Sequence, residues 1–157
     1  MIPDALGREW QLGTVQLDFF ASNKFNLNYV NEEGNKDQPI VIHRAIFGSL
    51  ERFLGVLIEH YGGSFPIWLS PVQFIVIPIS ENQFEYSEKI TSELLSLGFR
   101  VNIDKSSDRF NNKIRKAQLD KVPLMVICGE NEVKSKTFTV RFRNGENINN
   151  ITAENIS

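Results

Sequence analysis

The sequence predicts a two-part α/β protein, and two observations support this prediction. In the first part, apolar and polar residues alternate with a period of two and are followed by one amphipathic helix. In the second part, apolar strand-like segments alternate with helix-like segments, which is the order typical of a parallel-rich sheet flanked by helices. The Gly- and Pro-containing residues 62–71 separate the two patterns, so we place the boundary near Phe65, between domains 1–64 and 65–157.

Three strands and one helix are predicted in the first part. Residues 13–19, 24–30 and 39–44 alternate like strands, and the polar, turn-rich loop at 31–37 suggests that they form an antiparallel meander. In residues 48–61 the apolar positions recur at spacings of three and four, which predicts a helix packed on this sheet. The Gly pair that follows is expected to end the helix.

The second part is predicted to follow a βαβαβ order. Its elements are a strand at 73–79, a helix at 82–97, a strand at 99–104, a helix at 108–121 and a strand at 124–128. Residues 137–143 alternate cleanly and end at an Asn-Gly turn, so they should form an edge or penultimate strand. The tail resembles a helix start, with Thr152 as its cap, that stops after one turn. We therefore expect the chain to be a piece of a longer protein.

Composition excludes several classes of protein. With 41% hydrophobic and 23% charged residues, the chain is neither disordered, nor collagen-like, nor a coiled coil. The longest apolar stretches are far below the roughly 20 residues that span a bilayer, and the N-terminus has no signal-peptide pattern, so neither membrane insertion nor secretion is indicated. The lone cysteine, Cys128, lies in an apolar run and reads as a small buried hydrophobe, which fits a reducing, cytoplasmic location.

The net charge of −2 hides an uneven distribution. Residues 1–64 carry five basic and eight acidic residues, whereas residues 105–143 carry ten basic and four acidic residues, a net charge of +6. This basic span could meet phosphate, and the alternative is a set of solvated helix and strand faces. Lys113, Arg115 and Lys116 share one predicted helix, and we expect them to contact a phosphate backbone or simply to be solvated.

No self-contained catalytic motif is present: the chain has no G-x-S-x-G, no G-x-x-x-x-G-K-[ST] and no C-x-x-C. Four segments, at residues 7–19, 42–53, 112–118 and 122–132, instead resemble threonyl-tRNA synthetase in order and spacing. The first two resemble the C-terminal part of the class II catalytic domain, including motif 3. The last two resemble the anticodon-binding domain, so the resemblance covers essentially the whole chain.

This resemblance implies a fold and a function. The fold would be a remnant of the class II antiparallel sheet with the motif 3 helix, followed by an α/β anticodon-binding domain whose mixed, parallel-rich sheet is flanked by helices. The whole enzyme would activate threonine with ATP and Mg²⁺, transfer it to tRNA(Thr), contain Zn²⁺ and act as a cytoplasmic homodimer. Class II motifs 1 and 2 are absent from these 157 residues, so we expect this chain alone to be inactive.

Motif 3 supplies the predicted nucleotide contacts. The resemblance implies that Arg52 lies along the adenine ring and near the ATP phosphates, a role that suits a planar and permanently charged guanidinium. Ser49 resembles the serine that faces the substrate, and Gly48 would let the backbone approach the nucleotide. The alternative is that Arg52 pairs with Glu51 or Glu59 on a helix surface.

The zinc ligand and the pocket glutamines also follow from the resemblance. His43 matches a histidine that ligates the catalytic zinc, which coordinates the amino and hydroxyl groups of threonine and so discriminates against valine. The other protein ligands of that zinc would lie upstream, so this fragment is not expected to hold Zn²⁺ tightly. Gln11 and Gln16 match residues of the adenylate and threonine pocket. The alternatives are a packed histidine and a solvated strand face that Gln16 shares with Thr14 and Asp18.

Anticodon recognition requires side chains that read splayed bases and grip phosphates. The resemblance assigns Glu132 and Arg141 to base-reading positions, where a carboxylate accepts and a guanidinium donates hydrogen bonds. Lys121 stands where the family commonly has arginine, and Ser107 where it commonly has asparagine.

Two other functions stay open at this point. The chain could be a non-catalytic RNA-binding or interaction module derived from a synthetase. It could also be a doubly wound domain that binds a small molecule at the strand ends near Asp104 and Gly129, although this alternative explains the basic span poorly.

Overall fold

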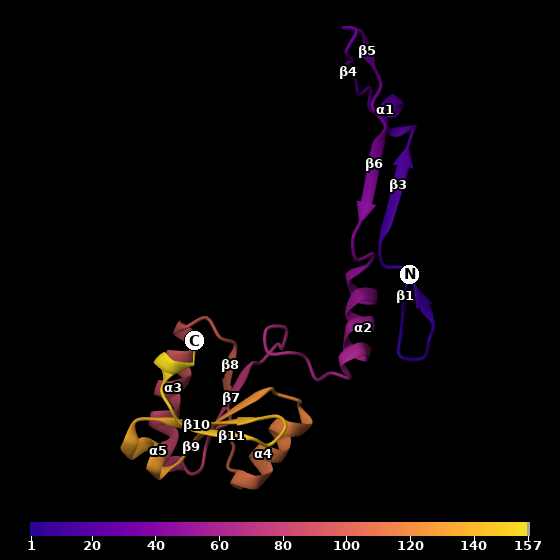
Figure 1. Cartoon of the computed structure of the whole chain (residues 1–157). Coiled ribbons are helices and arrows are strands. Elements are labelled where there is room, and N and C mark those ends of the chain that lie inside the picture. The colour runs from indigo at the N-terminus through magenta and orange to yellow at the C-terminus, as the bar shows by residue number, and fades with distance from the viewer. Residues whose placement is uncertain (157) are drawn as a thin grey trace. The chain divides into compact units, whose positions relative to one another are not determined.

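A computed structural model describes residues 1–156 and divides the chain into two compact units, Met1–Tyr61 and Gly62–Ser157. Figure 1 labels their helices and strands. The division falls at the start of the Gly- and Pro-containing segment that separates the two sequence patterns. None of the helices formed by residues 1–156 has the length and apolar character that crossing a bilayer would require.

The first unit consists of three strand pairs and two helices. Its elements are β1 (Ile2–Pro3), β2 (Glu9–Trp10), β3 (Thr14–Asp18), α1 (Ala21–Lys24), β4 (Tyr29–Val30), β5 (Lys36–Asp37), β6 (Val41–Ala45) and α2 (Leu50–Tyr61). The antiparallel pairs are β1 with β2, β3 with β6, and β4 with β5.

The predicted meander is wrong, because β3 pairs with β6 and not with residues 24–30. The carboxylate of Asp18 explains where the chain leaves β3: its Oδ1 accepts the backbone N–H groups of Phe20 and Ala21, both at 2.8 Å. Such a side-chain acceptor stabilises a turn and the start of a helix, and α1 begins at Ala21. Of residues 24–30, only Tyr29 and Val30 are in a strand.

The predicted helix of the first unit is confirmed as α2, and its ends follow from local chemistry. Ser49 caps it, because its Oγ accepts the backbone N–H of Arg52 at 3.2 Å. Gly62 and Gly63 follow it with φ of 54° and 78°, the left-handed conformation that commonly ends a helix. Gly48 also has positive φ, and a Cβ there would lie 2.7 Å from the carbonyl oxygen of Leu12, so only glycine fits at this approach.

The second unit contains one five-stranded sheet with helices. Its elements are β7 (Phe74–Pro78), η1 (Glu81–Gln83), α3 (Phe84–Ser96), β8 (Val101–Ile103), α4 (Phe110–Leu119), β9 (Leu124–Cys128), α5 (Glu130–Ser135), β10 (Phe138–Phe142), β11 (Asn147–Ile151) and η2 (Ala153–Asn155). The strand order is β11-β10-β9-β7-β8. Because β7 runs parallel to β8 and β9, while β10 is antiparallel to β9 and β11, the predicted mixed, parallel-rich sheet is confirmed.

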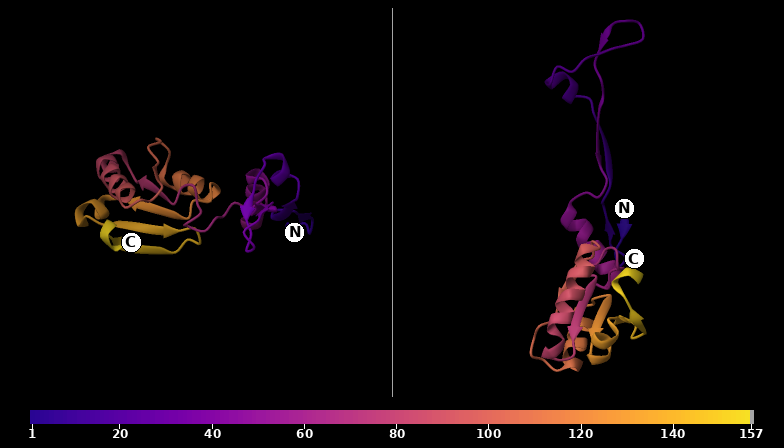
Figure 2. Two further views of the ribbon diagram at one scale, coloured as in Figure 1. Left: turned by 90° about the horizontal axis from the view of Figure 1, so that it is seen from above. Right: turned by 90° about the vertical axis from the view of Figure 1, so that its left-hand side faces the viewer.

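Helices pack on both faces of this sheet, as two further views of the ribbon illustrate (Figure 2). Successive residues of a strand point to opposite faces. Val76 therefore packs in one cluster, with Leu94 of α3 and Phe138, while Ile77 packs in a second cluster with Ala117 of α4. The second face is thus covered by α4 over β7 and β9. Thr139 and Arg141 of β10 point to that same second face, because Phe138 and Val140 fill the first.

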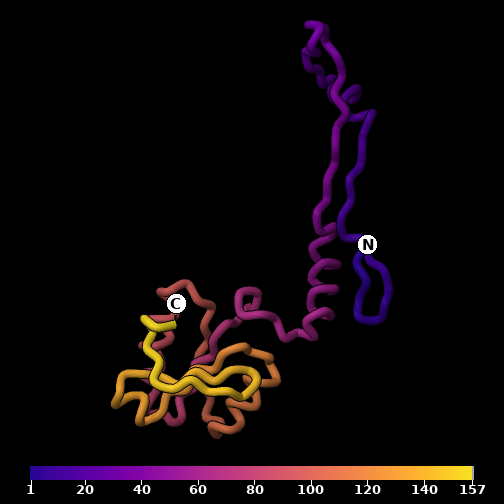
Figure 3. The backbone as a smooth tube through the Cα atoms, viewed as in Figure 1, coloured from indigo at the N-terminus to yellow at the C-terminus, as the bar shows by residue number. Residues whose placement is uncertain are grey.

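Two elements of the second unit were not predicted, α5 and β11. The segment of β11, Asn-Ile-Asn-Asn-Ile, is rich in asparagine, which is depleted in strands, and it forms a strand by pairing with β10 (Figure 3). The prediction that residues 137–143 form an edge or penultimate strand is confirmed, since β10 lies one strand from the edge. Thr152 precedes the short η2, but its side chain makes no capping hydrogen bond; the last residue of the predicted helix start, residue 157, lies outside the described residues.

Candidate functional site

Three of the residues predicted to contact the nucleotide lie where the loop before β3 meets α2: Gln11, Ser49 and Arg52. The Nη1 atom of Arg52 donates to the backbone oxygen of Gln11 at 3.0 Å, and the guanidinium lies 5.8 Å from the ring centre of Trp10. Arg52 is exposed and pairs with neither Glu51 nor Glu59; the latter lies 4.0 Å from Arg8 instead. The helix-surface ion pair that was the alternative for Arg52 is therefore not formed.

Gln16 and His43 stand directly opposite each other in the β3–β6 ladder, so their side chains share one face. Asp18 joins them on this face, and its Oδ2 lies 3.1 Å from Nε2 of His43. Hydrogen bonds from the N–H groups of Ala21 and Phe20, and then from His43, lower the pKa of the Asp18 carboxyl below its usual value. The three polar side chains border one open cavity together with Phe19 and Phe20.

A zinc ion requires three or four ligands, and this face does not supply them. Within residues 1–156, no group of three or more His, Cys, Asp or Glu side chains is placed to hold a metal ion. Because Nε2 of His43 bonds to Asp18, Nδ1 is the ring nitrogen left for another partner. The described residues alone thus do not form a metal site.

Glu132, the first predicted base-reading residue, lies in the first turn of α5 and is half-buried. Its Oε2 accepts the backbone N–H of Gly129 at 3.1 Å, and its Oε1 accepts the hydroxyl of Thr139 at 3.0 Å. A Cβ on Gly129 would lie 2.8 Å from Oε2 of Glu132 and 2.7 Å from Cδ1 of Ile79. Glycine at this position therefore allows the carboxylate to sit against the backbone and above β10.

Arg141, the second predicted base-reading residue, is half-buried on β10, two residues from Thr139 and on the same face. Its Nη1 donates to Oδ1 of Asn147 at 3.2 Å, while its Nε is buried and has no hydrogen-bond partner among the described residues. Thr139 also lies 3.2 Å from Oδ1 of Asn149. The structure thus brings Glu132 and Arg141 onto one polar part of the sheet surface, which we call the β10–β11 face: Glu132, Thr139, Arg141, Asn147 and Asn149.

Ser107 and Lys121 lie at opposite ends of α4 and are not brought together. The ten residues of this helix extend about 15 Å, with Ser107 in the exposed loop before it and Lys121 after it. Lys121 has a left-handed φ of 56°, and its Nζ donates to the backbone oxygen of Gly62. Its own carbonyl accepts Nη2 of Arg143 at 2.7 Å, which ties Lys121 to the end of β10.

The expectation that Lys113 contacts a phosphate backbone or is solvated is wrong, because its side chain is 3% exposed. Lys113 and Ala117 are four residues apart and form the buried face of α4. The Lys113 Nζ lies 3.4 Å from the backbone oxygen of Asp104 and 5.8 Å from the ring centre of Phe84. Arg115 and Lys116 are exposed, so these two residues of α4 are the ones available to phosphate.

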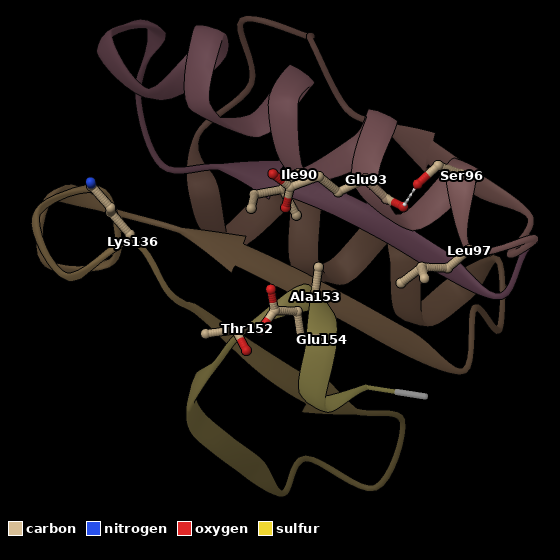
Figure 4. Close-up of a pocket in the computed structure, with 8 residues that line it drawn as sticks. All are labelled: Ile90, Glu93, Ser96, Leu97, Lys136, Thr152, Ala153 and Glu154. Atoms are coloured by element: carbon tan, nitrogen blue, oxygen red, sulfur yellow. Dashed lines mark hydrogen bonds between the residues drawn. The ribbon is translucent and has the colours of Figure 1, made fainter.

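Cavities in the second unit bear on the small-molecule alternative. One, of about 400 Å³, lies between α3 and the C-terminal segment and is lined by residues including Ile90, Glu93 and Ala153 (Figure 4). Another, of about 570 Å³, is bordered by Asp104. Neither is lined by Gly129, whose surroundings are filled by Ile79 and Glu132. The two strand ends named for a ligand therefore do not border a common cavity.

The sequence analysis missed Thr139, Asn147 and Asn149. The alternation in residues 137–143 could have assigned Thr139 to the face of Arg141, since the two are two residues apart. The asparagines could not be found in this way, because β11 itself was not predicted. Asp18 was assigned to the face of Gln16, but its hydrogen bond to His43 depends on the β3–β6 pairing, which was also not predicted.

Comparison with protein families agrees with this division of the chain. Residues 73–157 match the family described as the anticodon binding domain. Residues 1–61 match the family described as the tRNA synthetase class II core domain (G, H, P, S and T).

Individual proteins similar to the chain are synthetases. The threonine–tRNA ligases of Deinococcus deserti and Streptomyces avermitilis are each 49% identical to it, over 93% and 94% of this chain, and the chain spans 22% of either protein. A crystal structure of the RNA binding domain of threonyl-tRNA synthetase from Cryptosporidium parvum Iowa II superposes with a TM-score of 0.85 at 43% identity, covering 97% of this chain and 39% of that one. A crystal structure of prolyl-tRNA synthetase from Cryptosporidium parvum superposes with a TM-score of 0.68 at 26% identity, covering 92% of this chain and 33% of that one. The chain therefore belongs to the anticodon-binding domain family and corresponds to the C-terminal portion of threonyl-tRNA synthetase, in which a segment of the class II core precedes that domain.

Proposed function

We propose that this chain recognises the anticodon of tRNA(Thr) as part of a threonine–tRNA ligase, and that the β10–β11 face reads the bases. The observation that supports this proposal is that Glu132 and Arg141 lie on one polar face. Glu132 accepts the hydroxyl hydrogen bond of Thr139, which is two residues from Arg141 on the same side of β10, and all three lie within the residues that match the anticodon binding domain. On this face a carboxylate presents acceptors and a guanidinium presents a fork of donors. Together they can pair with the Watson–Crick edge of an unstacked base.

Phosphate contacts are assigned to exposed cations outside this face. Arg115 and Lys116 on α4 are solvent-accessible and belong to the basic residues 105–143. Ser107 and Lys121, at the two ends of α4, are too far apart to touch one nucleotide. We assign them to different nucleotides of the loop. These contacts supply affinity that falls as the salt concentration rises, whereas the β10–β11 face supplies selectivity.

The test is a titration of the 157-residue chain with the anticodon stem-loop of tRNA(Thr) and with a loop that differs at one anticodon base. Arg141→Ala should weaken binding of the cognate loop by about 1–3 kcal/mol and reduce the preference for it. Arg115→Ala, the matched control, should weaken both loops equally and reduce the salt slope by about 1. Equal losses of affinity for the two loops in Arg141→Ala would contradict the base-reading role of Arg141.

The first unit contributes to the active site of the whole ligase in this proposal. Arg52 lies against the adenine and phosphates of ATP, Gln11, Gln16 and Ser49 line the ATP and threonine pocket, and His43 supplies one ligand of a zinc ion. The hydrogen bond of Arg52 to the backbone of Gln11, and the shared face of Gln16 and His43, support this grouping. We further propose that the whole enzyme uses Mg²⁺ with ATP and acts as a cytoplasmic homodimer.

The 157-residue chain alone should not charge tRNA. In this proposal the 157 residues lack class II motifs 1 and 2, and the described residues do not form a metal site on their own. A charging assay with labelled threonine, ATP, Mg²⁺, Zn²⁺ and tRNA(Thr) should therefore show no product above background. Measurable threonyl-tRNA formation by the purified chain would overturn this part of the proposal.

A further inference from the structure

The Arg141 guanidinium is incompletely satisfied within the described part of the chain. A guanidinium carries five N–H donors, yet its hydrogen-bond partner here is a single oxygen, Oδ1 of Asn147 at 3.2 Å, and its buried Nε has none. No carboxylate of residues 1–156 forms an ion pair with it. Within the described residues Arg141 therefore has no opposing charge in an ion pair, and most of its donors have no partner, while one oxygen restrains its direction.

Strand pairing explains why Asn147 provides this oxygen. Arg141 and Asn147 are register partners in the antiparallel β10–β11 ladder, so their Cβ atoms are about 5 Å apart on the same face. The register shifts by one between Phe138 and Val140, which marks a β-bulge. Since a one-residue slip moves every side chain of a strand to the other face, the register beyond this bulge is what brings Asn147 to Arg141.

We propose that Asn147 is the residue that positions Arg141 for base reading, an inference that rests on the proposed function. A free arginine side chain samples many rotamers, and binding would have to restrict them at a cost in affinity. A hydrogen bond from Nη1 to Asn147 restricts the side chain before RNA arrives. Asn147 itself is exposed at the edge of the sheet, so its contact serves the guanidinium and not the core.

For the proposed role of Asn147, the absence of charge on its side-chain amide is as important as the oxygen that accepts the hydrogen bond from Arg141. An aspartate opposite Arg141 would orient it equally well but would form an ion pair, which reduces the attraction of Arg141 for an RNA base edge next to phosphates. Asparagine offers the acceptor without the opposing charge. The amide group of Asn147 also retains two N–H donors, which have no partner among the described residues.

The experiment replaces Asn147 in the 157-residue chain and measures affinity for the cognate anticodon stem-loop and for a loop with one changed base. Asn147→Leu keeps the size of the side chain and removes the acceptor, and it should lower the ratio of the two affinities about tenfold. Asn147→Asp keeps the acceptor and adds a charge, so it should preserve this ratio while weakening both loops. Asn102→Leu, a change of an exposed asparagine on the opposite edge strand β8, is the matched control and should leave the ratio unchanged.

The outcomes separate the inference from the function on which it rests. If the unchanged chain has no preference for the cognate loop, the proposed function fails. If it has that preference and Asn147→Leu retains it, the positioning role of Asn147 is overturned while the function stands. Circular dichroism and thermal unfolding check that each variant is folded, and Asn147→Ala, which also removes the acceptor but at a smaller volume, replaces Asn147→Leu if the leucine variant unfolds.

Discussion

Cys128 shows most clearly how burial controls the chemistry of a single residue. Its side chain is 0% exposed in the core cluster, and burial raises the pKa of its thiol to about 11. The sequence prediction of a small buried hydrophobe is therefore confirmed. Because the thiolate is the reactive species and the site is closed to solvent, the folded protein should protect this sulfur from thiol reagents.

We predict that a disulfide exchange reagent at pH 8 labels Cys128 only as fast as the second unit unfolds. The rate should be low in buffer and should rise steeply through the urea unfolding transition, in step with circular dichroism. Rapid and complete labelling in buffer, while the far-ultraviolet signal stays native, would contradict this account of the core.

The same burial predicts how stability depends on alkaline pH. Burial raises the pKa of Cys128 to about 11 and that of Tyr86, whose hydroxyl donates to the backbone oxygen of Thr137, to about 12. Both groups keep their protons to a higher pH in the folded chain than in the unfolded chain, where the pKa values of Cys128 and Tyr86 are near 9 and 10. Their contribution is therefore complete below about pH 9 and is lost between about pH 9 and 12. Urea unfolding should show a falling free energy over this range, and a constant value would contradict it.

At the scale of elements, α4 carries one basic side chain that is buried in the fold and others that are exposed to solvent. Its buried Lys113 lies beside Asp104. Burial by itself would raise the pKa of the Asp104 carboxyl, but hydrogen bonds from Ser106 and the charges of Lys113 and Lys116 bring this pKa below its usual value. The ammonium and the aliphatic stem of Lys113 thus hold the start of the β8–α4 loop against the helix. Arg115 on the same helix faces solvent.

This difference predicts opposite effects of two alanine substitutions. Lys113→Ala should lower the free energy of unfolding by about 2 kcal/mol, because it leaves a cavity in a packed site, and should not change the salt slope of RNA binding. Arg115→Ala should change stability by less than about 0.5 kcal/mol and reduce that slope. Urea denaturation and the titrations at two salt concentrations measure both quantities, and a reversed pattern would contradict the orientation of α4.

Elements with a strong local pattern could be predicted from the sequence, and elements made by distant pairing could not. The apolar periodicity of α2 and α3 and the continuous apolar run of β9 depend only on neighbouring residues. In contrast, β11 is a strand because β10 offers it hydrogen bonds, and β3 pairs with β6 across more than twenty residues. Tertiary pairing overrides local propensity in β11, whereas β3 and β6 were predicted as strands and tertiary structure decides only that they are partners.

The candidate site divides in the same way. Glu132 and Arg141 were predicted from the resemblance of their segments to a known family, which needs no knowledge of the fold. Their partners Thr139 and Asn147 depend on the register of β10 and β11, and the burial of Lys113 depends on the rotation of α4 about its axis. A single sequence carries this information only through the fold, so the structure was needed to find them.

At the scale of the whole molecule, the two units carry different charge. Residues 1–64 have a net charge of −3, whereas residues 65–157 have a net charge of +1, with the basic residues concentrated at 105–143. Electrostatic attraction of RNA should therefore act mainly on the second unit. The central claim of this account is that within this unit the β10–β11 face contacts the anticodon bases.

The most direct test of this claim is a map of amide chemical shifts in the ¹⁵N-labelled chain during titration with the anticodon stem-loop of tRNA(Thr). The account predicts that the largest shifts fall in α5, β10 and β11, around Glu132, Arg141 and Asn147, and that a loop with a changed anticodon base gives much smaller ones there. Residues around the cavity between α3 and the C-terminal segment should change little. Shifts concentrated at that cavity or in the first unit, with the β10–β11 face unchanged, would contradict the account.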